Sequence, residues 1–177
     1  MEVNIETAKS LFKQNKYQET IDTCNKLLTS DQNSMEALRL KAKSLLATNQ
    51  IAEARVYLNK VLDIKPDDYE IIKDLGNSYH FVGDNKTAKN YYQKAISING
   101  DYAPALTMLG SVEIHSGNKQ EALSLLIKAT ECDPKLAPAW TNLANGYIQL
   151  GQAIEAEAVC LKAIELSPNL ANAHFLL

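Results

Sequence analysis

The residue types that most often carry chemistry, cysteine and histidine, are few and scattered in this sequence. Cys24, Cys132 and Cys160 lie far apart, so neither a zinc-binding pair nor a disulfide framework is predicted. We expect all three to be buried free thiols in a reducing compartment. The three histidines are also scattered and lack the spacing of metal ligands.

Motifs of known catalytic sites are not evident either. The sequence contains no glycine-rich phosphate loop, no His-Glu-x-x-His helix and no Gly-x-Ser-x-Gly elbow. Carboxylates such as Glu155 and Glu157 fit the exposed surface of a helix. We therefore predict that this chain is not an enzyme and needs no cofactor or metal.

Composition and charge are typical of a folded, soluble protein. Of the 177 residues, 46% are apolar and 22% are charged. The net charge of −3 is too small to indicate binding to nucleic acid or to a membrane surface. No apolar run approaches the roughly 18 residues that a membrane span needs, and the N-terminal residues show no signal-peptide pattern. We therefore expect a cytoplasmic protein without nucleic-acid or membrane partners.

The residue pattern of the sequence repeats every 34 residues without a gap. The blocks begin at residues 1, 35, 69, 103, 137 and 171. Short side chains recur at the eighth and twentieth places of each block. The eighth place holds Ala8, Ala42, Gly76, Gly110 and Ala144, and the twentieth holds Thr20, Ala54, Ala88, Ala122 and Ala156. Because short side chains let two helices approach closely, each block is predicted to be an antiparallel helix pair.

A turn is predicted between the two helices of each block. In the block from 137, Trp140, Leu143, Ala144 and Tyr147 have the spacing of one helical stripe, and a second stripe begins after Gly151. The place of Gly151 holds glycine in three blocks and asparagine in two, and these residue types tolerate positive φ. Prolines then end the second helix in three blocks, at Pro66, Pro134 and Pro168.

This pattern closely resembles the tetratricopeptide repeat, in which Trp or Leu, Leu, Gly or Ala, and Tyr are followed by Gly, Ala, Tyr or Leu, Ala and Pro. The resemblance covers the whole chain as one domain, with repeats at 1–34, 35–68, 69–102, 103–136 and 137–170 and the start of a sixth at 171–177. It implies an all-α fold, a right-handed α-solenoid of antiparallel helix pairs. It also implies that Trp140, Leu143 and Tyr147 pack between repeats, and that a peptide or protein binds in a concave groove.

The resemblance assigns the groove to places 2, 5, 9, 12 and 13 of each first helix. In the first three repeats this stripe is basic, whereas in the last two it carries neutral polar residues and isoleucines. The predicted peptide-binding residues are Lys9, Lys13, Arg39, Lys43, Lys73, Asn77, His80, Thr107, Ser111, His115, Thr141, Asn142, Asn145 and Gln149.

Two interpretations of the basic stripe stay open. It could bind an acidic segment or a C-terminal carboxylate, while Asn142 and Asn145 hold an extended backbone, because an amide both donates and accepts hydrogen bonds. Alternatively, the stripe is a solvated face of mixed charge. A glutamate stands three residues before three of the cations, a spacing that allows ion pairs along one helix: Glu6, Glu36 and Glu70.

Two binding patterns known in the family are incomplete here. The clamp for the C-terminal carboxylate of chaperones is matched by Lys73 and Asn77, but Met108 and Pro138 break it. The asparagine ladder of the nucleocytoplasmic sugar transferases is matched only by Asn142. The resemblance therefore does not identify the partner.

Two further features depart from the repeat. Lys41 occupies a packing place that is Leu in three other repeats, so we expect its stem to lie along the core and its ammonium to reach water. Residues 171–177 are too few to cover the preceding helix, so we expect that the natural chain continues or that this end meets another copy. Three functions follow: a protein-interaction module, a substrate-recruiting or regulatory arm of a larger enzyme beyond Leu177, and a self-assembling scaffold.

Overall fold

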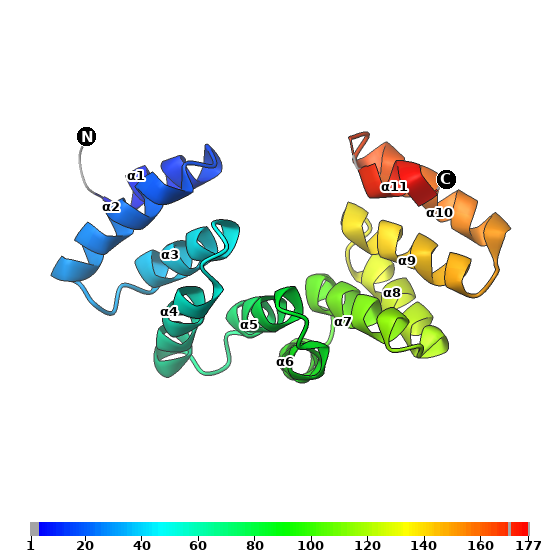
Figure 1. The fold of residues 1–177 in the computed structure, drawn as a ribbon, viewed down its shortest axis with the longest axis horizontal. Helices are drawn as coiled ribbons and strands as arrows, with labels where there is room; N and C mark the ends of the chain where they lie inside the picture. The colour runs from blue at the N-terminus through cyan, green and yellow to red at the C-terminus, as the bar shows by residue number, and fades with distance from the viewer. Residues whose placement is uncertain (1–3, 170, 177) are drawn as a thin grey trace. The chain divides into compact units, whose positions relative to one another are not determined.

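The computed structural model describes residues 4–169 and 171–176, and every regular element in that part of the chain is an α-helix (Figure 1). The all-α prediction is therefore confirmed. The helices are α1 (Ile5–Lys13), α2 (Tyr17–Ser30), α3 (Met35–Ala47), α4 (Ile51–Ile64), α5 (Tyr69–Phe81), α6 (Asn85–Ile98), α7 (Ala103–His115), α8 (Lys119–Cys132), α9 (Ala137–Gln149), α10 (Ala153–Leu166) and α11 (Ala171–Leu176).

The chain divides into two compact units, unit 1 (Met1–Asp84) and unit 2 (Asn85–Leu177). In unit 1, α1 packs on α2 and α3 packs on α4; in unit 2, α7 packs on α8 and α9 packs on α10. First helices also contact each other, since α1 lies against α3 and α7 against α9. The division falls between α5 and α6, inside the third predicted repeat, so the single domain over residues 1–177 stays a prediction.

The turns inside the helix pairs have the backbone that the glycine and asparagine pattern predicts. At each of them one residue has positive φ, between 60° and 84°: Asn15, Asn49, Gly83, Gly117 and Gly151. The following N–H then reaches back to the helix, as Gln152 N does to Tyr147 O at 3.0 Å. This hydrogen bond satisfies a carbonyl at the end of the first helix and reverses the chain.

The small residues lie where the helices approach most closely. All five residues at the eighth place and all five at the twentieth are buried. At Gly110 the approach leaves no room for a side chain, because an added Cβ would lie 2.6 Å from Leu126 Cγ. The sequence pattern therefore reports helix packing rather than a site.

The aromatic stripe of α9 also belongs to the core. Leu143 is buried in a cluster with Leu126, and Trp140 and Tyr147 pack against that cluster. The indole Nε1 of Trp140 donates to Pro134 O at 3.0 Å, which joins α9 to the preceding turn. The prediction that these three stripe residues pack between repeats is confirmed.

Lys41 corrects one expectation. Its side chain is buried, with 4% of the residue exposed, so the ammonium does not reach water. Lys41 Nζ instead donates to the Tyr57 hydroxyl at 2.5 Å, lies 3.9 Å from the centre of that ring, and is 3.5 Å from Glu53 Oε1. A nearby carboxylate and an aromatic ring replace the lost hydration, which is how a buried ammonium stays tolerable.

Candidate functional site

The cations of unit 1 are largely committed to carboxylates. Lys9 Nζ lies 2.9 Å from Glu6 Oε1 on its own helix and 3.1 Å from Glu36 Oε1 on α3. Both hydrogen bonds raise the pKa of Lys9, so the ammonium form is favoured. Lys9 thus joins the first two repeats rather than offering a free charge to a ligand.

Arg39 has the same role one repeat later. Its guanidinium pairs with the buried carboxylate of Asp68, and Nη1 lies 3.7 Å from Glu70 Oε2. Asp68 also caps α5, because its side chain accepts a hydrogen bond from Ile71 N at 3.4 Å. One carboxylate therefore anchors both the cation of α3 and the start of α5.

The spacing of three residues between glutamate and cation predicted three ion pairs within one helix, and of these three only Glu6–Lys9 is formed among the described residues. Glu36 and Glu70 pair instead with the cation of the preceding repeat. Lys73 pairs with its neighbour Asp74. The basic stripe of unit 1 is therefore mostly a ladder of ion pairs.

Lys13 and Lys43 differ from the other three cations. Both are exposed, and within residues 4–169 and 171–176 neither forms an ion pair. Asn77 and His80 lie half-buried on α5 of the same unit. An acidic ligand of unit 1 would thus find two lysines without a carboxylate partner.

Some of the predicted peptide-binding residues of unit 2 are buried and hydrogen-bonded within their own helices, and others are exposed. Thr107 and Thr141 are buried, 3% and 7% exposed, and their hydroxyls donate to carbonyls of their own helices. Little of either side chain is therefore left for a ligand, although Thr141 still lines the hollow described next, and the assignment of both to the peptide site stays a prediction. His115 Nδ1 lies 2.7 Å from the carbonyl of Ser111 one turn earlier, and Gln149 is exposed.

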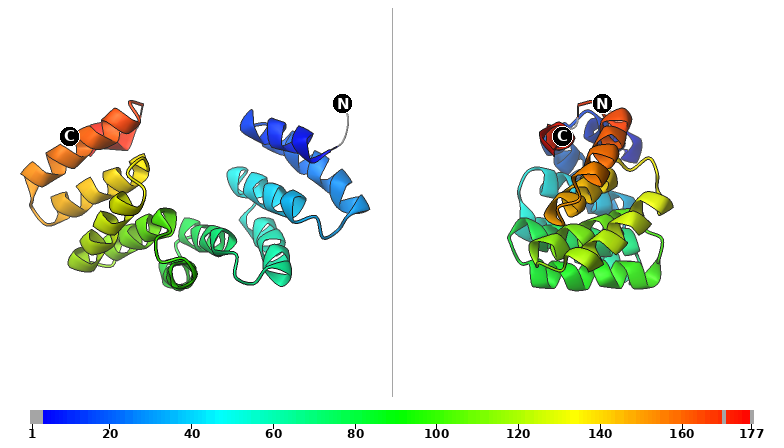
Figure 2. Two further views of the ribbon diagram at one scale, coloured as in Figure 1. Left: turned by 180° about the vertical axis from the view of Figure 1, so that it is seen from behind. Right: turned by 90° about the vertical axis from the view of Figure 1, so that its right-hand side faces the viewer.

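Asn142 and Asn145 line a hollow of about 180 Å³ on unit 2. The helix α11 lies against α9 and α10 (Figure 2). Its residues supply the other wall of the hollow. None of the described residues that line the hollow is charged; they are Thr141, Asn142, Asn145, Asn172, Phe175 and Leu176. Amide groups around exposed apolar side chains suit a neutral, extended peptide segment.

Sequence reasoning missed the α11 wall of this hollow. Asn172 and Phe175 stand at places 2 and 5 of the block that begins at 171, so the groove rule applied to that block would have included them. A second hollow on unit 1, lined by residues of α2, α3 and α4, was missed for another reason. Most of its residues belong to second helices, for which the groove rule says nothing.

Cysteine chemistry shows one difference from the prediction. Cys24 and Cys160 are buried, as expected, but Cys132 at the end of α8 is exposed. Burial raises the pKa of the Cys24 thiol to about 11, although nearby Lys41 opposes the shift.

Within the described residues no group of three His, Cys, Asp or Glu side chains could hold a metal ion. In the same part of the chain, no helix has the length and apolar character for crossing a bilayer.

Paired helices, positive-φ turns and buried small residues at fixed places define a helical repeat protein. Two family models, both described as tetratricopeptide repeat, match residues 11–76 with 82–144, and 137–170. The chain therefore belongs to the tetratricopeptide repeat family and is an α-solenoid protein. Proteins of this family are in general non-enzymatic protein-interaction modules, and nothing in the matches indicates catalysis.

Solved structures share this fold at low sequence identity. The Thermus thermophilus protein TTC0263 has a TM-score of 0.80 at 20% identity, over 97% of this chain and 93% of that chain. A chain of the APC/C hetero-tetramer Cut9–Hcn1 has a TM-score of 0.89 at 21% identity, over 96% of this chain but 34% of that chain. YrrB, described as having an unusual peptide-binding site, has a TM-score of 0.66 at 24% identity, over 97% and 88%. No curated protein matches the chain.

Proposed function

We propose that this protein-interaction module binds an extended, largely neutral peptide segment in the hollow of unit 2. The observation that carries the proposal is the set of amides from Asn142, Asn145 and Asn172 around Phe175. Each amide can donate to and accept from a peptide backbone, and Phe175, which is 89% exposed, offers an apolar contact. A peptide-binding site is also described for YrrB, which shares the fold.

An acidic segment is a weaker candidate ligand for unit 1. The carboxylates that already pair with Lys9 and Arg39 would have to be displaced, so net attraction would depend on Lys13 and Lys43. Changing these two lysines to glutamate tests the acidic ligand more directly than changing Lys73, whose ammonium is already paired with Asp74.

The test of the neutral-peptide proposal uses a phage-displayed library of random peptides, about twelve residues long, selected on the purified protein. Selected peptides are synthesised, and their affinities are measured by fluorescence polarisation. The double variant Asn142→Ala/Asn145→Ala removes two amides from the hollow. We expect it to bind at least about fivefold more weakly, because each backbone hydrogen bond contributes about 0.5–1.5 kcal/mol.

The matched control is Asn90→Ala, which removes an exposed amide from α6 in the same unit and away from the hollow. Its affinity should equal that of the wild type. Selection of no peptide above the level on an unrelated protein would contradict the proposal. So would equal affinities of the double variant and the wild type.

Self-association is the second candidate function, and the outer face of α10 favours it. Ile154 and Leu161 are 83% and 54% exposed and lie seven residues apart, which places them on one side of the helix. Sedimentation equilibrium across a concentration series tests this function. A mass that rises with concentration in the wild type and not in Ile154→Asp/Leu161→Asp would support it, and a constant monomer mass would exclude it.

A further inference from the structure

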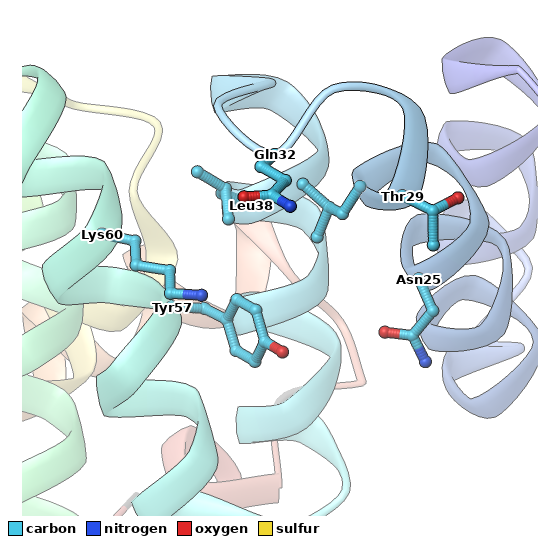
Figure 3. A pocket seen from close by; sticks show the side chains of 7 residues that line it. Asn25, Thr29, Gln32, Leu38, Tyr57 and Lys60 are labelled. Carbon is cyan, nitrogen blue, oxygen red and sulfur yellow. The ribbon is translucent and has the colours of Figure 1, made fainter.

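Unit 1 carries a hollow of about 370 Å³ between α2 and α4, with α3 beneath it (Figure 3). It is separate from the first-helix stripe, because most of its residues belong to second helices. Lys60 and Tyr57 on α4 face Asn25 on α2 across the hollow, and Gln32 from the α2–α3 turn points into it. The lining residues are Asn25, Leu28, Thr29, Gln32, Leu38, Tyr57 and Lys60.

Hydrogen-bond donors dominate the rim of this hollow. Among the described residues, Lys60 is the one charged lining residue of this hollow and forms no ion pair. Its ammonium lies 5.1 Å from the centre of the Tyr57 ring. The Tyr57 hydroxyl already accepts a hydrogen bond from Lys41 Nζ, so its own proton is left for another acceptor. The amides of Asn25 and Gln32 add further donors, and neither has a hydrogen-bond partner in the described part of the chain.

An ammonium, a phenol proton and two amides match a carboxylate, which offers about four acceptor positions. The floor has different chemistry. Leu28 and Leu38 line it, and Leu38 is buried beneath the hollow. The site therefore combines a rim of hydrogen-bond donors with an apolar base, and the oxygens of the two rim amides remain to accept a peptide N–H.

A neighbouring hollow of about 380 Å³ extends this site along α4. It shares Gln32 and Lys60 and adds Asn33, Asp63 and Ile64. The Asp63 carboxylate disfavours a second negative charge there, whereas Ile64, which is 43% exposed, offers apolar contact. A peptide would thus place its carboxylate beside Lys60 and its preceding residues over Ile64.

We propose that this hollow of unit 1 binds the C-terminal residue of a peptide, with its carboxylate on Lys60 and Tyr57 and an apolar side chain on Leu28 and Leu38. In a C-terminal residue the carboxylate, the N–H and the side chain are all attached to the Cα atom. The carboxylate and the N–H can therefore contact the rim while the side chain contacts the floor. The proposal concerns a different unit from the asparagine hollow, so either proposal can fail without the other.

The experiment titrates the isotope-labelled full chain with small probes and follows the side-chain amide signals of Asn25 and Gln32 by NMR. The first probe is N-acetyl-L-leucine, which reproduces a C-terminal leucine. N-acetyl-L-leucinamide lacks the carboxylate, and N-acetylglycine lacks the apolar side chain. The α-amide of N-acetyl-L-aspartic acid presents a side-chain carboxylate without a free chain end.

We expect N-acetyl-L-leucine to bind with a Kd of about 1–10 mM, as its size allows. The amide and N-acetylglycine should bind at least about fivefold more weakly, because each loses one of the two recognised groups. Lys60→Gln should weaken binding similarly, and it should keep the fold because Lys60 is exposed. Lys26→Gln, an exposed lysine on α2 outside the lining, is the matched control and should bind as the wild type does.

Several results would overturn the proposal. One is the absence of saturable shifts up to about 50 mM probe. Others are equal binding of the amide, or equal losses in Lys60→Gln and Lys26→Gln. Tighter binding of the aspartic acid probe would assign the hollow to an acidic side chain instead of a chain terminus.

Discussion

The first helices of unit 1 and unit 2 occupy equivalent places in the repeat but use their polar residues differently. In unit 1, Lys9 and Arg39 pair with carboxylates contributed by the following repeat. In unit 2, Asn145 and Asn172 line a hollow whose described lining residues carry no charge. Charge in unit 1 thus links repeats, while amides in unit 2 stay available for a ligand.

The interiors of the two units are alike in burying paired charges. Unit 1 buries an ammonium at Lys41 and a carboxylate at Asp68, each paired with a partner. Unit 2 buries the carboxylate of Glu113, which pairs with Lys89, and has an apolar cluster around Leu126 and Leu143. Buried ion pairs contribute little net stability but are costly to break, whereas apolar packing stabilises in proportion to the area buried. The number of cations on a helix therefore does not predict whether that helix binds an acidic ligand.

The largest expected effect is the loss of apolar packing in unit 2. Leu143→Ala should lower the free energy of unfolding by about 2–5 kcal/mol, because the truncation leaves a cavity beside Leu126. Urea unfolding followed by circular dichroism measures the change. Leu161→Ala, on an exposed side of α10, is the control and should change stability by less than about 0.5 kcal/mol. A similarly small change in the stability of Leu143→Ala would contradict the assignment of Leu143 to the core.

The corresponding test in unit 1 targets the buried ammonium. Lys41→Ala leaves the Tyr57 hydroxyl and Glu53 without their donor, so we expect a loss of about 1–3 kcal/mol. Hydrogen exchange should quicken in α3 and α4 more than in α7 to α10. Lys43→Ala, two residues away and exposed, should leave both measurements unchanged. Equal behaviour of the two variants would mean that the buried contacts of Lys41 do not stabilise unit 1.

Substitution by alanine at two helical glycines of unit 2 should change the free energy of unfolding in opposite directions. Gly110→Ala forces a Cβ to within 2.6 Å of Leu126 Cγ, so we expect a loss of about 1–3 kcal/mol. At Gly146 the nearest atoms to an added Cβ are 3.7 Å away, so Gly146→Ala should gain about 0.5–1 kcal/mol from helix propensity. Thermal melts of both variants measure the difference. A gain at both positions would show that the α7–α8 contact is looser than described.

The smallest effect is expected at the ion-pair ladder of unit 1. The pKa of Lys9 is raised above 10.5 by Glu6 and Glu36, so its contribution is present below that pH and is lost as the pH rises further. The difference in urea midpoint between wild type and Lys9→Gln should thus shrink between about pH 8 and about pH 11.5. Salt should shrink it too.

Lys13→Gln is the control for Lys9→Gln, because Lys13 is an exposed lysine of the same helix without an ion pair among the described residues. Its urea midpoint should follow the wild type at every pH and salt concentration. A Lys9→Gln midpoint that also follows the wild type throughout would show that the ladder contributes nothing measurable.

The sequence by itself determined the fold class and the local geometry of the turns. Periodicity decides these features, because a helix exposes one face per 3.6 residues and only some residue types tolerate positive φ. Asn49 has a positive φ of 62° and Gly151 one of 75°, so the two residue types were correctly treated as equivalent. The burial of Trp140, Leu143 and Tyr147 against the core followed from the same stripe.

Only the tertiary structure decided which polar groups remain available. Glu36 has two cations within reach, Arg39 on its own helix and Lys9 on α1, and the distance between helices selects Lys9. Thr107 lies on the predicted groove stripe yet is buried, because the neighbouring helix covers so short a side chain. The rim of Asn25, Gln32 and Lys60 brings together residues of the first and second repeats. Periodicity predicts which face of a helix a residue lies on. The ion-pair partner and the exposed fraction of its side chain depend on the distances between helices, which the sequence of a single helix does not determine.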